Sequence, residues 1–329
     1  MMNNTESRSE IFRSVLDADN IQIITHKNPD GDTLGSSFAL LHVLKKMGKN
    51  AEVICSDKVS KRMRFISDGI EELLPTFDPD FVVSVDVASP NLIGDSLADY
   101  RTRVDVAIDH HYSNSSFAKK TILSAEASSA GELMFELFEE AGIDFDDYIA
   151  EKLYTAISFD TGCFKFSNVT PKTHRIAAQL LNFSFDHSRI NTKLFDTASL
   201  AQLRIENEAV SSVRQYKNNK ITIATVTSEQ IARLGVDETE IDGLTAITRR
   251  VEGTIVGITV RQKSDGEIKI SLRSNENFDV SKIAVKFGGG GHIRAAACVM
   301  RCPVEEAEKR ILEATFEEWD KQNGDGIPC

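Results

Sequence analysis

The chain has 329 residues and a net charge of −12, and its 41% hydrophobic and 27% charged residues are typical of a soluble globular protein large enough for two domains. No apolar run approaches the roughly 20 residues that span a bilayer, and residues 1–10 lack the apolar core of a signal peptide. The five cysteines include no CxxC pair, which argues against a disulfide framework or a zinc ribbon and favours a location in the cytoplasm. The negative net charge argues against a protein that wraps a long nucleic acid.

The first stretch with candidate ligands joins a predicted strand to a predicted helix. A short apolar run at 21–24 predicts a buried strand, and spaced apolar residues over 34–45 predict an amphipathic helix. His26, Asp30 and Asp32 therefore lie on a strand-to-helix loop, where open α/β sheets bind ligands. One imidazole and two carboxylates within seven residues suit a divalent metal.

Two glycines follow in the same stretch, and they leave two interpretations open. Gly31 and Gly35 are expected to let the backbone turn tightly and approach a ligand closely. The sequence Asn-Pro-Asp-Gly is also a strong turn sequence, so the stretch could be a plain surface turn. This motif alone therefore does not decide between a metal site and a turn.

Further elements are expected to end on groups that can bind a metal. They are Asp86 in a strand at 81–87, His110 and His111 after a strand at 104–108, and Asp160 after a helix at about 148–159. Adjacent side chains of an extended segment alternate in direction, so one histidine can bind a metal while the other faces a substrate. Because one parallel sheet brings its strand ends to a common edge, we expect all these groups to converge.

The second half of the chain predicts a smaller α/β domain. Residues 186–216 contain no Gly or Pro and predict a long polar helix that connects the domains. The later elements are expected to be a strand at 220–226, a hairpin of 251–261 and 267–273, and helices at 280–286 and 303–319. Four consecutive glycines precede His292, and their N–H groups can hold an anion, although such runs also serve as hinges.

The charge differs between the two parts of the chain. Residues 207–300 carry thirteen Lys/Arg and eleven Asp/Glu, a net charge of +2, which leaves −14 for the remainder. An acidic part that can gather metal cations is thus joined to a mildly basic part that can hold an anion.

The candidate ligands are six N/O donors from four loops. They are His26, Asp30, Asp32, Asp86, His110 and Asp160. Their number and type fit two divalent metals that share a carboxylate, an arrangement that activates water for phosphoryl transfer. The two imidazoles favour Mn²⁺, with Mg²⁺ or Co²⁺ as alternatives.

The sequence resembles the DHH phosphoesterase superfamily, which is named for the triplet Asp109-His110-His111. The other blocks of that family are present in order: His26-Lys-Asn-Pro-Asp-Gly-Asp, Asp86 and Asp160-Thr-Gly. The glycine-rich block that ends at His292 is similar to the signature of the DHH-associated C-terminal domain. The chain most resembles the branch that hydrolyses short oligoribonucleotides from the 5′ end or dephosphorylates 3′-phosphoadenosine 5′-phosphate (pAp).

The resemblance implies a role for each candidate residue. One metal would bind His26 and Asp30, the other would bind Asp32, His110 and Asp160, and Asp86 would bridge them. Asp109 would orient His110, and His111 would face the scissile phosphate as a hydrogen-bond donor or general acid. The nucleotide would be held across a cleft between the domains by Arg273, Gly289, Gly290, Gly291 and His292. Departures from the family pattern at Ala296-Ala297-Cys298 and at Cys163 could alter the choice of substrate.

We therefore expect an α/β protein with a doubly wound, mainly parallel sheet in residues 1–190, a helical linker at 191–216 and a smaller α/β substrate-binding domain at 217–329. The expected partners are short single-stranded RNA or small nucleotides, not long duplexes or membranes, and a homodimer is left open.

Three other functions share some of these sequence features. An inorganic pyrophosphatase would share the metal blocks but would be expected to offer more Lys and Arg in its second domain. A phosphodiesterase acting on linear or cyclic dinucleotides cannot be separated from the main interpretation by sequence. A catalytically silent nucleotide-binding regulator would be expected to lose at least one of the six ligands, and none is lost.

Overall fold

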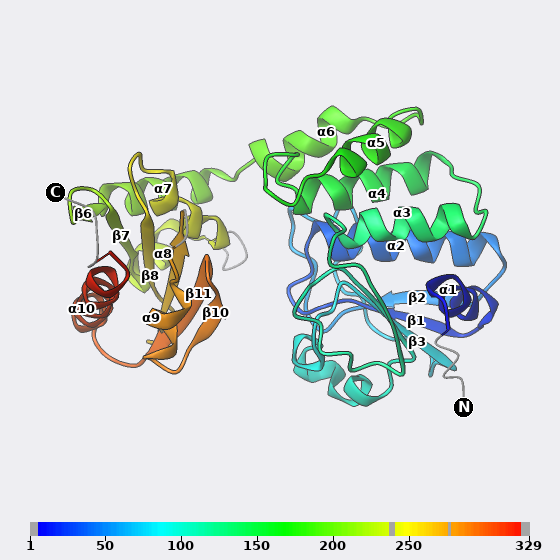
Figure 1. Ribbon diagram of the computed structural model, residues 1–329, viewed down its shortest axis with the longest axis horizontal. Coiled ribbons are helices and arrows are strands. Elements are labelled where there is room, and N and C mark those ends of the chain that lie inside the picture. Colours follow the sequence, from blue (N-terminus) through cyan, green and yellow to red (C-terminus); the bar gives the residue numbers. More distant parts are fainter. Residues whose placement is uncertain (1–5, 237–240, 276–277, 324–329) are drawn as a thin grey trace. The chain divides into compact units, whose positions relative to one another are not determined.

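The computed structural model describes residues 6–236, 241–275 and 278–323, and it divides the chain into two compact units, Met1–Thr197 and Ala198–Cys329 (Figure 1). Each unit has its own sheet and its own buried apolar core. Within the described ranges, no helix combines the length and apolarity needed to cross a membrane.

The first unit is built on a five-stranded parallel sheet with the order β2-β1-β3-β4-β5. Its strands are β1 (Ile21–Ile24), β2 (Ala51–Ile54), β3 (Phe81–Val85), β4 (Val106–Asp109) and β5 (Lys120–Leu123). This order is that of a doubly wound sheet whose direction of winding reverses between β1 and β3, the point where such sheets bind ligands. The predicted fold class is confirmed.

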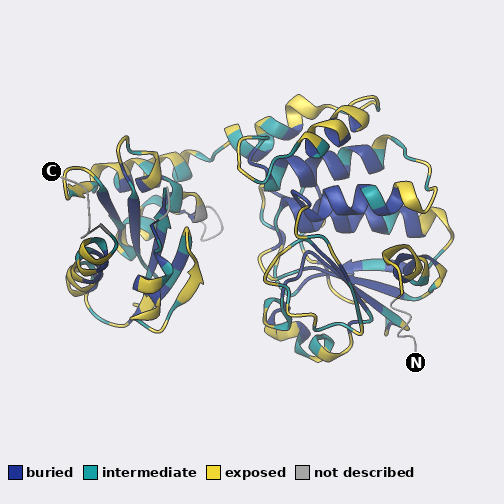
Figure 2. Ribbon diagram, viewed as in Figure 1, coloured by how far each residue is buried: buried dark blue, intermediate teal, exposed yellow. Residues whose placement is uncertain are grey.

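Helices pack against one face of this sheet, and alternate strand residues point into the core between them. The helices of the unit are α1 (Arg8–Asp17), α2 (Gly31–Lys46), α3 (Ala130–Glu140), α4 (Asp147–Asp160), α5 (Pro171–Leu180) and α6 (His187–Asn191). A smaller apolar cluster on the other face is covered by two 3₁₀ segments, Pro90–Leu92 and Asp95–Thr102. Figure 2 shows that the strands and the inner sides of α2, α3 and α4 are buried.

The glycines of the first motif serve helix packing. A Cβ atom at Gly35 would lie 2.5 Å from the backbone oxygen of Lys152 in α4, and one at Gly31 would lie 2.5 Å from the Phe159 ring. Neither glycine has a positive φ. The expectation that they approach a ligand is wrong for Gly35, which instead lets the backbones of α2 and α4 come together.

We expect Gly35→Ala to lower the free energy of unfolding by about 1–3 kcal/mol. The added methyl group would overlap the backbone oxygen of Lys152, which cannot rotate away as a side chain can. Urea titration followed by circular dichroism measures the change. Gly243→Ala is the control, since its Cβ would meet nothing closer than 3.6 Å. Equal stability of the two variants would contradict the assigned packing role.

The segment predicted as one connecting helix over 186–216, and with it the helical linker at 191–216, is broken into four elements. They are α6, a π-helical turn (Thr192–Asp196), α7 (Leu200–Ser211) and β6 (Arg214–Tyr216). The Ser199 hydroxyl accepts a hydrogen bond from the N–H of Gln202 and so starts α7 as a new helix. Both α7 and β6 belong to the second unit.

The second unit contains a six-stranded mixed sheet with the order β10-β11-β9-β8-β7-β6. Its other strands are β7 (Ile221–Val226), β8 (Val256–Gln262), β9 (Ile268–Ser274), β10 (Gly290–His292) and β11 (Ala295–Met300). Its other helices are α8 (Ser228–Leu234), α9 (Ser281–Val285) and α10 (Val304–Asn323), with 3₁₀ segments at Asp242–Ala246 and Thr248–Arg250. The predicted β8–β9 hairpin is confirmed, whereas β11 was not predicted and the glycine run forms an edge strand beside it.

Candidate metal centre

Six side chains from four segments, at strand ends and helix ends, converge at the carboxyl edge of the first sheet, where the sequence analysis expected them. Donor atoms of His26, Asp30 and Asp86 lie within 4.8 Å of one another, and so do donor atoms of Asp32, His110 and Asp160. The six residues thus form two neighbouring groups of three.

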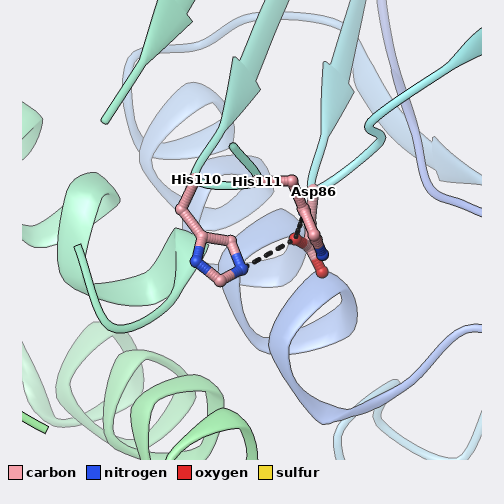
Figure 3. A group of neighbouring side chains, drawn as sticks. All are labelled: Asp86, His110 and His111. Carbon is pink, nitrogen blue, oxygen red and sulfur yellow. Dashed lines mark ion pairs between the residues drawn. The ribbon is translucent and has the colours of Figure 1, made fainter. Parts of the chain in front are cut away.

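Asp86 belongs to the first group and also faces the second. One of its carboxylate oxygens, Oδ2, lies 3.7 Å from Nε2 of His26. The other, Oδ1, lies 3.5 Å from Nε2 of His110 (Figure 3). His110 Nε2 is also 3.7 Å from oxygens of Asp32 and Asp160. These separations exceed ordinary hydrogen-bond lengths, so the donor atoms face one another without bonding directly.

The backbone positions these side chains through strand ends and helix ends. Asp86 follows β3 directly and has a φ of 62°, a left-handed conformation that is uncommon outside glycine. Asp30 caps α2, where its Oδ1 accepts hydrogen bonds from two backbone N–H groups, while its Oδ2 lies 3.7 Å from His26. Asp160 is the last residue of α4. The ends of these strands and helices therefore fix the positions of the candidate ligands.

Asp32 lies in the first turn of α2, and three hydrogen bonds hold its carboxylate in place. Its carboxylate accepts hydrogen bonds from the N–H groups of Ala130 (2.7 Å) and Gly131 (2.9 Å) at the start of α3, and from the Ser36 hydroxyl. The first turn of α3 thus stabilises a negative charge that is fully buried.

The two candidate histidine ligands are oriented in the same way. Nδ1 of His26 lies 2.8 Å from the carbonyl of Lys27, and Nδ1 of His110 lies 3.3 Å from the carbonyl of Ala127. Because a carbonyl oxygen only accepts, each Nδ1 carries the proton, and each Nε2 directs a lone pair toward the carboxylates. Burial, followed by the charge of His111, lowers the pKa of His110 and favours this neutral form.

His111 is held differently. Its Nδ1 donates to Oδ1 of Asp109 at 2.8 Å. The same nitrogen lies 3.4 Å from Asp86 (Figure 3). This hydrogen bond raises the pKa of His111 more than burial lowers it. The other carboxylate oxygen of Asp109 accepts a hydrogen bond from Asn114. Asp109 therefore holds the ring of His111, and it also accepts a hydrogen bond from the backbone N–H of His110 at 2.8 Å. The ring of His110 faces the carbonyl of Ala127 instead. The prediction that Asp109 orients His110 thus rests on the backbone contact.

The donor set fits divalent cations. Burial and neighbouring carboxylates raise the pKa of Asp86 and of Asp32 well above the usual range, and burial followed by the charge of Asp30 raises the pKa of Asp160 to about 6. Asp86 Oδ1 and His110 Nε2 are buried and make no hydrogen bond within the described part of the chain. Crowded carboxylates and unpaired donor atoms are what a bound cation neutralises and satisfies.

Two asparagines that support the centre were not singled out from the sequence. Asn114 holds Asp109, and the side-chain amide of Asn168 donates to the backbone oxygens of Asp160 and Ser128. Asn114 lies five residues after Asp109, on the same loop, which is the only signal that the sequence offers for it.

The candidate substrate-binding residues lie on the second sheet. Arg273 in β9 is paired with Ala295 in β11, which is paired with His292 in β10, so the three share one row of the sheet. A Cβ at Gly289 would lie 2.2 Å from the oxygen of Ala297, whereas Gly290 has open space around it. The glycine block is thus shaped partly by its packing on β11.

Comparison with protein families matches residues 20–157 to the DHH family, N-terminal domain, and residues 218–320 to the DHHA1 domain. The chain is 29% identical over 306 residues to the bifunctional oligoribonuclease and PAP phosphatase NrnA of Thermus thermophilus, which covers 91% of this chain and 90% of that protein. It is 26% identical to the cyclic-di-AMP phosphodiesterase GdpP of Geobacillus thermodenitrificans, over 91% of this chain but 48% of that protein.

A solved structure has the same fold. The exopolyphosphatase-related protein from Bacteroides fragilis superposes with a TM-score of 0.87 at 26% identity, covering 96% of this chain and 98% of that one.

Proposed function

The chain belongs to the DHH family, and on that premise we propose that it is a metal-dependent phosphoesterase that hydrolyses short oligoribonucleotides from the 5′ end and removes a phosphate from pAp. The NrnA relative, which is similar over nearly its whole length, carries both activities in its name. The observation that carries the proposal is the position of Asp86 between two groups of donors, beside His111.

The residues of the centre have two proposed roles in hydrolysis, metal binding and proton donation. We propose that His26, Asp30 and Asp86 hold one cation and that Asp32, His110, Asp160 and Asp86 hold a second. Cations bound there would activate water and neutralise charge on the attacking and leaving oxygens. Nδ1 of His111 is engaged by Asp109, so its Nε2, which bonds to no described residue, is available to donate a proton to the leaving oxygen.

The identity of the cation and the cellular compartment are both proposed from the chemistry of the side chains. The mixture of imidazole and carboxylate donors favours Mn²⁺ over Mg²⁺ or Co²⁺. The four described cysteines are free thiols, which suits the reducing cytoplasm predicted from the sequence. Formation of a homodimer stays a prediction.

The similarity to GdpP favours one alternative, cleavage of cyclic or linear dinucleotides by the same centre. This chain spans only about half of that protein, so the alternative has less support than the NrnA-like activity.

A panel of substrates at fixed Mn²⁺ tests the proposal: pAp, the dinucleotide pGpG, short oligoribonucleotides, cyclic dinucleotides and pyrophosphate. We expect hydrolysis of pAp and of short oligoribonucleotides with the highest kcat/KM. Preferential hydrolysis of cyclic dinucleotides would favour the alternative, and activity confined to pyrophosphate would contradict both.

A further inference from the structure

An exposed aromatic side chain lies on the segment that follows a candidate metal ligand. Phe166 comes shortly after Asp160 in the chain, and it is 50% exposed. The side-chain amide of Asn168 donates to the backbone oxygen of Asp160 at 3.1 Å, so this segment is tied back to the centre. A large apolar ring that stays half exposed at such a place is a candidate contact for a substrate.

The backbone of this segment is held in an unusual conformation. Gly162, Cys163 and Phe164 have successive φ values of 58°, 58° and 62°, and left-handed residues other than glycine are uncommon. Thr161 helps to fix the turn, because its carbonyl accepts a hydrogen bond from the N–H of Phe166 at 3.0 Å. Backbone conformations of this kind are concentrated at functional sites.

The turn gives its two aromatic rings different surroundings. Phe164 packs against the core of the first unit, where its ring lies 6.0 Å from that of Tyr154 and is stacked on His174 at 5.5 Å. Phe166 lies over Gly162 instead. A Cβ atom at Gly162 would lie 2.4 to 2.7 Å from the three carbons at the tip of the Phe166 ring, Cζ, Cε1 and Cε2.

These distances show how the Phe166 ring is oriented. A Cβ beyond the edge of the ring would be much closer to Cζ than to either Cε atom, so the near-equal distances place Gly162 against the ring face. Gly162 is itself buried, whereas half of Phe166 is exposed, so the ring presents its other face. A ring fixed in this way loses little conformational freedom when a ligand stacks on it.

We propose that the open face of Phe166 is a stacking platform for the nucleobase next to the scissile phosphate. The inference rests on the proposed function, and it concerns residues of the first unit alone. Gly162 is two residues from Asp160, a span of at most about 7 Å, so the ring is within reach of a base whose phosphate is held at the centre. Every base has a π face, so this contact favours the presence of a base over its identity.

A second exposed aromatic side chain, Tyr112, directly follows His111 and is 93% exposed. A ring exposed to this extent has neither face packed against the protein, so a ligand would have to order it at a cost in side-chain entropy. Phe166 is therefore the better-placed platform, and Tyr112→Ala serves as a comparison.

The test compares pAp with its analogue that lacks adenine, 1-deoxyribose 3,5-bisphosphate, in the full-length protein with Mn²⁺. Phe166→Ala should raise KM for pAp roughly 5- to 100-fold, the usual effect of losing one stacked base, and leave KM for the analogue unchanged. The value of kcat should change little, because stacking stabilises the ground state and the transition state alike. Phe166→Trp should retain the affinity for pAp.

Phe166→Leu separates stacking from a merely structural role, because leucine still covers Gly162 but has no π face. Its KM for pAp should stay raised. Recovery of the unaltered KM in Phe166→Leu, or an equal rise for both substrates in Phe166→Ala, would overturn the platform. A larger base-dependent effect of Tyr112→Ala than of Phe166→Ala would overturn it as well.

Met47→Ala is the matched control, since this exposed apolar residue caps the end of α2 opposite Asp30. Phe166→Ala and Phe166→Leu should bind as much Mn²⁺ as the unaltered protein, and loss of Mn²⁺ from both would assign the ring a structural role instead. If the unaltered protein hydrolyses neither pAp nor the analogue, the proposed function itself fails, and the platform is withdrawn with it.

Discussion

Asp86→Ala is expected to lower kcat at least about 10³-fold on pAp and on short oligoribonucleotides. Removing one group that stabilises developing charge typically lowers kcat 10²- to 10³-fold, and Asp86 faces both histidines of the centre, at 3.7 and 3.5 Å. Its loss therefore affects both groups of donors, whereas loss of Asp160 would affect one.

The fold should survive this substitution. Burial, followed by the charges of neighbouring carboxylates, raises the pKa of Asp86, so its removal relieves both a desolvation cost and like-charge repulsion in the metal-free protein. We expect the melting temperature without metal to be unchanged or higher, and the bound Mn²⁺, measured by calorimetry, to fall. Asp78→Ala, which removes an exposed carboxylate, is the control. Near-normal turnover with bound metal in Asp86→Ala would show that Asp86 is not a shared ligand.

His111→Ala is expected to lower kcat by about 10²- to 10⁴-fold, the usual contribution of a general acid. The Asp109 carboxylate, itself held by the Asn114 amide, holds this ring in place, with Nδ1 3.4 Å from Asp86. In the proposed mechanism, the other ring nitrogen, Nε2, donates the proton. Because His111 is not one of the six proposed ligands, the Mn²⁺ content should stay close to that of the unaltered protein.

Substrates with different leaving groups distinguish a general acid from a residue with only a structural role at position His111. A nucleoside alkoxide needs a proton when it departs, but p-nitrophenolate does not. The defect of His111→Ala should therefore be large on oligoribonucleotides and small on a p-nitrophenyl ester of a nucleotide. Equal defects on both substrates would contradict the role of general acid and favour a role in binding the phosphate.

The convergence of the candidate ligands could be predicted from the sequence because they lie beside elements with clear patterns. The β-branched run before Asp86 and the apolar run before His26 place both residues at strand ends, and parallel strands end at a common edge. The rings of His110 and His111 do bond to different groups, the carbonyl of Ala127 and the carboxylate of Asp109. Metal binding by one and substrate binding by the other stays a prediction.

Contacts between distant segments could not be predicted in this way. The role of Gly35 depends on the backbone of α4, more than a hundred residues away, and the orientation of His110 depends on a carbonyl group, which every residue has. The break between α6 and α7 contains no Gly or Pro, so rules based on those residues miss it: the backbone is extended at Thr197, and Ser199 starts α7 anew. Asn191 at the end of α6 is held by Ser158 and Tyr154 of α4. Tertiary contacts override local propensity at these places.

The dependence of rate on substrate length tests the central claim most directly. The chain carries a net charge of −12, and its proposed phosphate contacts are few, so it lacks the long basic track that binding a polynucleotide requires. Initial rates on single-stranded RNA of two to about twenty nucleotides, at fixed salt and Mn²⁺, should fall once the RNA exceeds a few residues, and duplexes should be poor substrates. Rates that hold steady or rise with length would contradict the account and indicate a processive exonuclease.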